Sequence, residues 1–141
     1  MTSQLNVDTI VDKAGSGGTN VKVANTSTYV SDGGATTQNT VQSLCKTWCS
    51  TNHNETGTHT INDSFNTTSV ADGGVGKTTN TYTNNFSSGN YSAVLGTTND
   101  NNQSGIQTGP NTSSIVIVTY QHDGSAEDTT AQNSAIFGDL A

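Results

Sequence analysis

Ser114-Ile115-Val116-Ile117-Val118-Thr119-Tyr120-Gln121 holds the longest apolar run of the chain and decides its fold class. β-Branched and aromatic residues dominate this stretch, and they favour the pleated surface of a strand. Residues 115–118 are apolar at every position, without the alternation of a strand that has one face in water. The stretch therefore predicts a central strand that is buried on both faces.

Turn-forming residues separate the other segments that have strand composition. These segments are residues 58–65, 67–71, 79–86, 91–97 and 134–140. Between them lie runs rich in Gly, Asn and Asp, at residues 72–76, 87–90, 99–102 and 122–124. Short strands with turns of this kind are typical of an antiparallel sandwich. We therefore predict an all-β fold, with a jelly-roll-like antiparallel β-sandwich head over residues 58–141.

Residues 1–34 have the pattern of a short extended anchor rather than of a domain. Apolar and polar side chains alternate there, and Gly-rich breakers interrupt them at residues 15–18 and 32–34. An extended segment can bind a neighbouring protein by adding a strand to its sheet edge. The apolar candidates for this attachment interface are Leu5, Val7, Ile10, Val21 and Val23.

Residues 35–57 form a neck between anchor and head, and their secondary structure is open. Apolar side chains recur there at helical spacing, at Val41, Leu44, Cys45, Trp48 and Cys49. That spacing predicts a short helix near residues 38–48, whereas the Thr-rich flanking sequence favours extended structure. We keep both alternatives at this point.

The composition predicts a core that is shared between copies of the chain. Hydrophobic residues make up only 29% of the 141 residues, against roughly 45–50% in an ordinary domain. Such a chain buries little apolar surface by itself. We therefore expect a homotrimer. The residues expected in its core or trimer interface are Val41, Leu44, Trp48, Phe65, Tyr82, Phe86, Tyr91 and Phe137.

The charge excludes two classes of partner. The net charge is -7, and the chain has four basic residues, all of them lysine. So few cations cannot neutralise the phosphates of a nucleic acid, and an anionic membrane repels an acidic chain. No stretch approaches the roughly 20 apolar residues of a membrane span. We expect neither nucleic-acid binding nor membrane insertion. The first residues also lack the order of a signal peptide, which fits release by lysis.

Two motifs point to bound groups, and both have a simpler interpretation. Residues 71–78 fit a relaxed phosphate-binding loop, but strand formers follow where that loop needs a helix, so a Gly-rich hairpin turn is expected. Cys45, Cys49, His53 and His59 are potential zinc ligands whose spacing is not that of a standard finger. We expect free thiols and no cofactor, and the sequence leaves metal binding by these four residues open.

No arrangement of residues indicates catalysis. Asp123, Glu127 and Asp128 lie close to His122 in the sequence, but neighbouring residues of a turn or strand point apart. Acid–base or nucleophilic catalysis needs two such groups within reach of each other. We therefore predict that the chain is not an enzyme. A small hydrolase remains a weaker hypothesis, which requires an acid pair or a Ser–His pair within hydrogen-bond reach.

Several stretches, taken in order, resemble the tail-fibre-like proteins of marine phages and cyanophages. Leu5-Asn6-Val7-Asp8-Thr9-Ile10 is similar to the start of cyanophage fibre-like proteins, and Tyr82-Thr83-Asn84-Asn85-Phe86 resembles a strand of the family's C-terminal domain. Further stretches similar to that domain are residues 44–48, 61–70, 72–76, 90–92 and 135–139. The chain departs from the family in three respects: no long shaft separates anchor from head, residues 49–53 lack the family's usual strand, and Lys77-Thr78 is inserted before the strand at Tyr82.

The resemblance implies a non-enzymatic structural protein on the surface of a bacteriophage particle. Its anchor would dock on other virion proteins of the capsid or tail, as a short trimeric fibre or spike or as a capsid decoration. A host-surface glycan is a further expected partner, through a loop that contains Asn99, Asp100, Asn102 and Gln103. The alternative is a free carbohydrate-binding module, which needs an exposed aromatic platform. A buried Trp48 would argue against that alternative.

Overall fold

The computed structural model describes residues 27–30, 37–53, 59–98, 102–108 and 110–139. The chain divides into two compact units, Met1–Val41 and Gln42–Ala141. In the first unit, β1 (Thr28–Val30) pairs antiparallel with β2 (Thr37–Asn39). The five predicted attachment residues lie outside the described ranges: Leu5, Val7, Ile10, Val21 and Val23.

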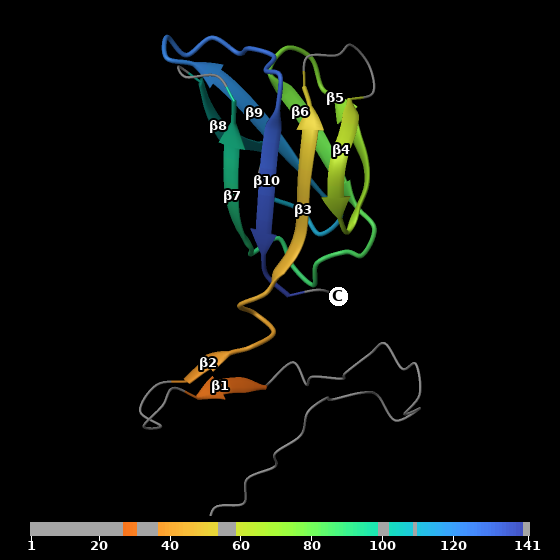
Figure 1. The fold of residues 1–141 in the computed structure, drawn as a ribbon, viewed down its shortest axis with the longest axis vertical. Coiled ribbons are helices and arrows are strands. Elements are labelled where there is room, and N and C mark those ends of the chain that lie inside the picture. Colours follow the sequence, from red (N-terminus) through yellow and green to blue (C-terminus); the bar gives the residue numbers. More distant parts are fainter. Residues whose placement is uncertain (1–26, 31–36, 54–58, 99–101, 109, 140–141) are drawn as a thin grey trace, which may run out of the picture. The chain divides into compact units, whose positions relative to one another are not determined.

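The second unit consists of two four-stranded antiparallel sheets that lie face to face (Figure 1). The first sheet has the order β4-β3-β10-β7, formed by β3 (Cys45–Asn52), β4 (Thr60–Phe65), β7 (Ser92–Thr97) and β10 (Gln132–Phe137). The second sheet has the order β5-β6-β9-β8, formed by β5 (Thr67–Asp72), β6 (Lys77–Tyr82), β8 (Asn102–Thr108) and β9 (Ser114–Gln121). This arrangement confirms the prediction of an all-β fold with antiparallel sheets.

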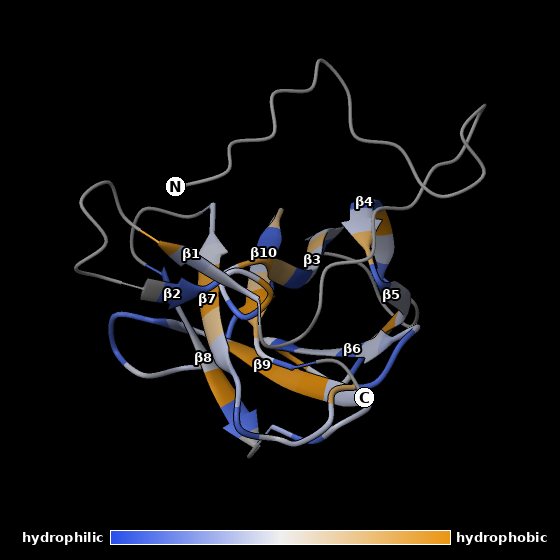
Figure 2. Cartoon of the chain, turned by 90° about the horizontal axis from the view of Figure 1, so that it is seen from below, coloured by the Kyte–Doolittle hydropathy of each residue, from blue (hydrophilic) through white to orange (hydrophobic). Residues whose placement is uncertain are grey.

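β9 has the interior position that its sequence predicts. It lies between β6 and β8 and pairs antiparallel with both. Ile115 and Ile117 are buried between the sheets, and Val118 is buried as well, whereas Val116 on the outer side is only half-buried. Burial on both faces therefore holds for part of the strand. β9 also stands out as a hydrophobic strand in Figure 2.

The predicted short helix near residues 38–48 is wrong, because no described residue lies in a helix. β3 is extended and pairs with β4 on one side and β10 on the other. Thr47, Cys49 and Thr51 are buried toward the second sheet, and Trp48 lies on the opposite face. Two ladders of backbone hydrogen bonds and the β-branched threonines outweigh the helical spacing of the apolar residues. Part of the predicted neck is therefore an inner strand of the sandwich.

An apolar core lies between the two sheets. Tyr82, Phe86, Ile115, Ile117 and Ile136 form it. Three half-buried residues pack against these five: Tyr91, Ala93 and Leu95. Ring centroids of Tyr82 and Phe86 lie 5.0 Å apart, and those of Phe86 and Tyr91 lie 4.6 Å apart. Tyr82 and Phe86 thus lie in the core, as predicted, and Tyr91 packs against it.

The other residues predicted for the core or trimer interface are not in this core. Phe65 and Leu44 are exposed, at 54% and 56% of their surface. Trp48 and Phe137 are half-buried on the first sheet, and Val41 belongs to the first unit. A core position is therefore wrong for these five residues. The reason for Trp48 and Phe137 is strand alternation, which places their neighbours Thr47, Cys49 and Ile136 between the sheets.

Candidate functional site

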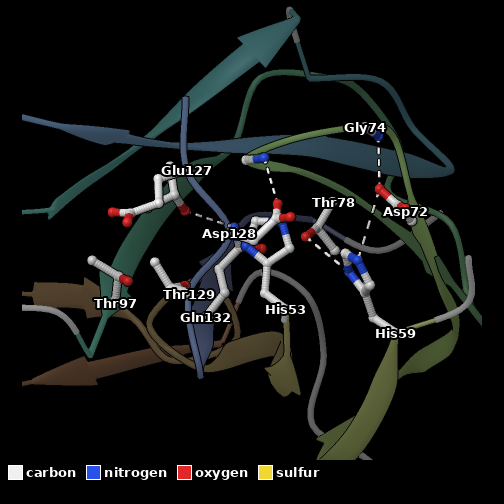
Figure 3. Close-up of polar contacts among 12 residues, drawn as sticks. His53, His59, Asp72, Gly74, Thr78, Thr97, Glu127, Asp128, Thr129 and Gln132 are labelled. Atoms are coloured by element: carbon white, nitrogen blue, oxygen red, sulfur yellow. Dashed lines mark hydrogen bonds and ion pairs between the residues drawn. The ribbon is translucent and has the colours of Figure 1, made fainter. Parts of the chain in front are cut away.

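Beside the apolar core, the interior of the sandwich contains a group of buried polar side chains. Near the end of β3 and the start of β10, Figure 3 shows the buried side chains of His53, His59, Thr78 and Gln132. Thr119 is buried beside them, since its Oγ1 accepts a hydrogen bond from Gln132 Nε2 at 3.1 Å. The other buried polar or charged residues in the described part of the unit are Lys46, Thr47, Thr51, Asn80, Thr129 and Ser134. We use the name histidine cluster for His53, His59, Asp72, Thr78, Asp128 and Gln132, which contact one another through the distances given below. A polar group in such a position needs a partner, because burial removes its water.

His53 directly follows β3 and is fully buried. Its Nδ1 lies 3.5 Å from Gln132 Nε2, and its Nε2 lies 3.8 Å from Asp128 Oδ1. Within the described residues, Nε2 has no hydrogen-bond partner. Burial lowers the pKa of His53, and His59 lowers it further, while the nearby carboxylates act in the opposite direction. His53 is therefore held neutral at pH values where a free histidine would begin to take up a proton.

His59 lies directly before β4 and is buried beside His53. The two ring centroids are 4.7 Å apart in an edge-on arrangement. Thr78 Oγ1 lies 3.2 Å from His59 Nδ1, and Asp72 Oδ1 lies 3.9 Å from His59 Nε2. Each imidazole thus faces one carboxylate at a distance beyond a hydrogen bond. Asp72 is the last residue of β5, and Asp128 lies in the loop before β10.

A glycine turn holds both carboxylates in place. Asp72 Oδ1 accepts a hydrogen bond from Gly74 N at 2.7 Å, and Asp128 Oδ1 accepts one from Gly76 N at 2.7 Å. Gly74 and Gly76 have φ angles of 97° and 72°, which glycine adopts without the strain of a side chain. Lys77 then begins β6 rather than a helix. The expected hairpin turn is confirmed, and the turn lacks the helix that a phosphate-binding loop requires.

The histidine cluster contains a hydroxyl, an imidazole and a carboxylate in the order of a catalytic triad, namely Thr78, His59 and Asp72. Thr78 is 0% and His59 is 2% exposed. A nucleophile must be reached by its substrate. The acids that the sequence grouped together have other partners: Asp123 Oδ1 accepts from Ser125 N, and Glu127 Oε2 accepts from Asn102 Nδ2. The cluster therefore has the organisation of a buried polar core, not of an open catalytic site.

The structure brings together two of the four potential metal ligands. His53 and His59 are adjacent, but Cys49 lies four residues before His53 on an extended segment, about 13 Å away at the rise of a strand. Cys45 Sγ donates to Thr47 O at 3.1 Å. Burial raises the pKa of the Cys49 thiol to about 11, which disfavours the thiolate that binds metals. Among the described residues, no group of three or more His, Cys, Asp or Glu side chains is placed to hold a metal ion.

The predicted surface-contact loop is partly a strand. Asn102 and Gln103 begin β8 and pair with Gln121 and Tyr120 of β9, so their prediction as loop residues is wrong. Pairing with an apolar inner strand makes this Asn- and Gln-rich segment extended despite its composition. The remaining two residues of that prediction, 99 and 100, lie outside the described ranges.

The outer face of the first sheet carries an apolar row that crosses all four strands. Phe65 pairs with Trp48, Trp48 with Ala135, and Ala135 with Val94. Side chains of paired residues share one face of an antiparallel sheet. Phe65 and Val94, on the two edge strands, are 54% and 63% exposed, and the two inner residues are half-buried. We call these four residues the apolar row.

The neighbouring row of pairs on the same face is polar. It consists of Asp63, Ser50, Asn133 and Gly96. Among the eight residues of the two rows, Asp63 is the only one with a charge. The sequence singled out Trp48 and Phe65 but missed Val94 and Ala135, because only the strand register places these four in line.

No helix in the described part of the chain is long and apolar enough to cross a membrane. The comparisons with known proteins yield no relative. No family model matches the chain, no curated protein matches it, and no solved structure matches it.

Proposed function

We propose that this chain is a non-enzymatic structural protein of a bacteriophage particle, which assembles as a homotrimer. The sandwich would be a jelly-roll-like head of a short fibre, spike or capsid decoration at the particle surface. Residues 1–34 would dock it onto other virion proteins. The observation that carries the proposal is the apolar row, which crosses one sheet face of an acidic chain and is exposed at both ends.

The distribution of large apolar side chains supports a role in assembly. In the described part of the chain, eight hydrophobic residues are buried, and eight large ones are exposed. Scattered exposed apolar residues are normal, but contiguous patches mark contacts with other molecules. A chain with 29% hydrophobic residues places Phe65 and Val94 on an open sheet face. We propose a phage particle as the assembly because the sequence resembles phage fibre proteins.

The test of the proposal has two parts. Sedimentation of the purified full chain should give a species of three times 14.5 kDa. Mass spectrometry of phage particles purified from the source of the gene should then detect the chain at a constant ratio to the major capsid protein. A chain that is absent from purified particles would contradict the virion assignment, whatever its mass in solution.

Carbohydrate binding is the second candidate, and one observation favours it. Trp48 is half-buried on an outer sheet face and pairs with the exposed Phe65, so the two rings are accessible from one side. Aromatic side chains on a flat sheet face can stack against sugar rings, and Asp63 and Ser50 beside them offer hydrogen bonds. Glycan-array binding by wild type but not by Trp48→Ala would support this function. Binding that Trp48→Ala retains would argue against it.

A further inference from the structure

We infer that the apolar row is the surface through which copies of this chain associate, with the Phe65 end of one copy against the Val94 end of the next. The inference deepens the proposed function, on which it rests, by placing the trimer contact on the outer face of the first sheet. The row lies on the face of the first sheet that points away from the second sheet (Figure 1).

The position of the row fits contact with a flat surface. Phe65 and Val94 lie on β4 and β7, the two edge strands, and Trp48 and Ala135 lie on the inner strands between them. The row thus spans the full width of the sheet. Its exposed ends are the parts with the most apolar surface still to bury, since the inner two residues are already half-buried.

The charge distribution favours a second copy of the chain as the partner that covers the apolar row. The chain carries a net charge of -7, so most approaches between two copies bring acidic surfaces together. The apolar row has no charged residue, and its neighbouring polar row has only Asp63. Two copies that meet through this face avoid most of their mutual repulsion. An interface core is depleted of charge and enriched in aromatic residues in the same way.

A threefold arrangement uses both ends of the row. Contacts in a cyclic trimer are heterologous, so that each joins two different patches of the chain. Phe65 at one edge and Val94 at the other are two such patches. Three sheets around an axis would each present Phe65 to one neighbour and Val94 to the other. Trp48 and Ala135 would face the axis.

The experiment compares full-length variants in solution. Phe65→Asp and Val94→Asp each place a charge at one end of the row, and Ala71→Asp is the matched control, because Ala71 is exposed on the outer face of the other sheet. Sedimentation velocity and light scattering measure the mass over a wide range of concentrations. Emission from Trp48, the single tryptophan, reports burial of the row independently of the mass.

We expect wild type and Ala71→Asp to be trimers with blue-shifted Trp48 emission. Phe65→Asp and Val94→Asp should raise the dissociation constant by more than about tenfold, since an unpaired charge would be buried. Their emission should shift to the red. Val94→Thr keeps the strand propensity of the site and should weaken association less. It therefore serves as the variant to use if an aspartate prevents folding.

Three outcomes would overturn the inference. Trimers of unchanged strength in both aspartate variants would place the contact elsewhere and leave self-assembly intact. A wild type that stays monomeric at every concentration would refute the contact itself, while detection of the chain in phage particles would decide the virion role separately. A monomeric wild type that binds glycans through Trp48 would assign the row to sugar recognition instead.

Discussion

The turn that holds the two carboxylates gives a quantitative test, through the pair Gly76→Ala and Gly74→Ala. Both glycines have positive φ, so alanine costs roughly 1–2 kcal/mol of backbone strain at either site. A Cβ at Gly74 would meet nothing within 4 Å. A Cβ at Gly76 would lie 2.6 Å from Thr119 O and 2.9 Å from Glu127 N. Alanine at Gly76 therefore requires the backbone to move, and alanine at Gly74 does not.

The movement would disturb two hydrogen bonds of Gly76. Thr119 N donates to Gly76 O at 2.7 Å, and Gly76 N donates to Asp128 Oδ1 at 2.7 Å. A neutral hydrogen bond contributes about 1 kcal/mol and one to a charged group about 1.5–3 kcal/mol. With the backbone strain included, Gly76→Ala should lower the free energy of unfolding by on the order of 3–6 kcal/mol. Gly74→Ala should lower it by roughly 1–2 kcal/mol.

Urea and thermal unfolding of both variants, followed by circular dichroism, measure these losses. For a unit of this size the melting temperature of Gly76→Ala should fall by about 12 °C or more. Equal losses in the two variants, within about 0.5 kcal/mol, would refute the reasoning. They would show that the close approach of the turn to Thr119 and Glu127 does not contribute to stability.

Three further predictions concern buried groups. Because the pKa of His53 is lowered in the folded chain, the unfolded chain takes up the proton first as the pH falls. The stability that neutral His53 contributes is therefore present above pH 6.5 and is lost below it, by at most about 1.4 kcal/mol per pH unit for one group. Urea midpoints should fall less steeply with decreasing pH in His53→Asn than in wild type, whereas the exposed control His122→Gln should behave as wild type. Ile117→Ala, at a fully buried site, should cost roughly 2–5 kcal/mol in urea unfolding, and a loss below about 1 kcal/mol would contradict its core position. In a Cys45→Ser background, Cys49 should react with a thiol reagent only after unfolding, because it is buried and its pKa is raised to about 11, and rapid reaction of the folded chain would contradict this.

Strands could be predicted from the sequence where the residue types agree with tertiary pairing. β9 was predicted with the bounds that the structure has, because Ile115 and Ile117 are β-branched residues in an unbroken apolar run. β8 was missed, since Ile106 is its one large apolar side chain among Asn, Gln, Ser and Gly. It is extended because it pairs with β9 at the edge of the sheet. Such a strand depends on its neighbour more than on its own residues.

The candidate site could be predicted only in part for a related reason. His53 and His59 were identified as potential ligands from residue type alone. Their contacts come from distant parts of the chain: Thr78 on β6, Asp128 in a loop and Gln132 on β10. These residues meet because the strands pair in one particular register and the two sheets then pack face to face. Sequence spacing does not predict that register, so neither the histidine cluster nor the apolar row could be predicted from the sequence.

The buried polar residues weaken the expectation, drawn from composition alone, that the chain must share its core with other copies. A chain with 29% hydrophobic residues was expected to complete its core with residues of other copies. Instead, buried Thr, His and Gln side chains, including Thr51, Thr78 and Gln132, fill much of the interior beside the apolar core. A thin apolar core alone therefore no longer requires a partner. The case for assembly rests on the apolar row, where Phe65 and Val94 keep exposed the kind of surface that the interior lacks.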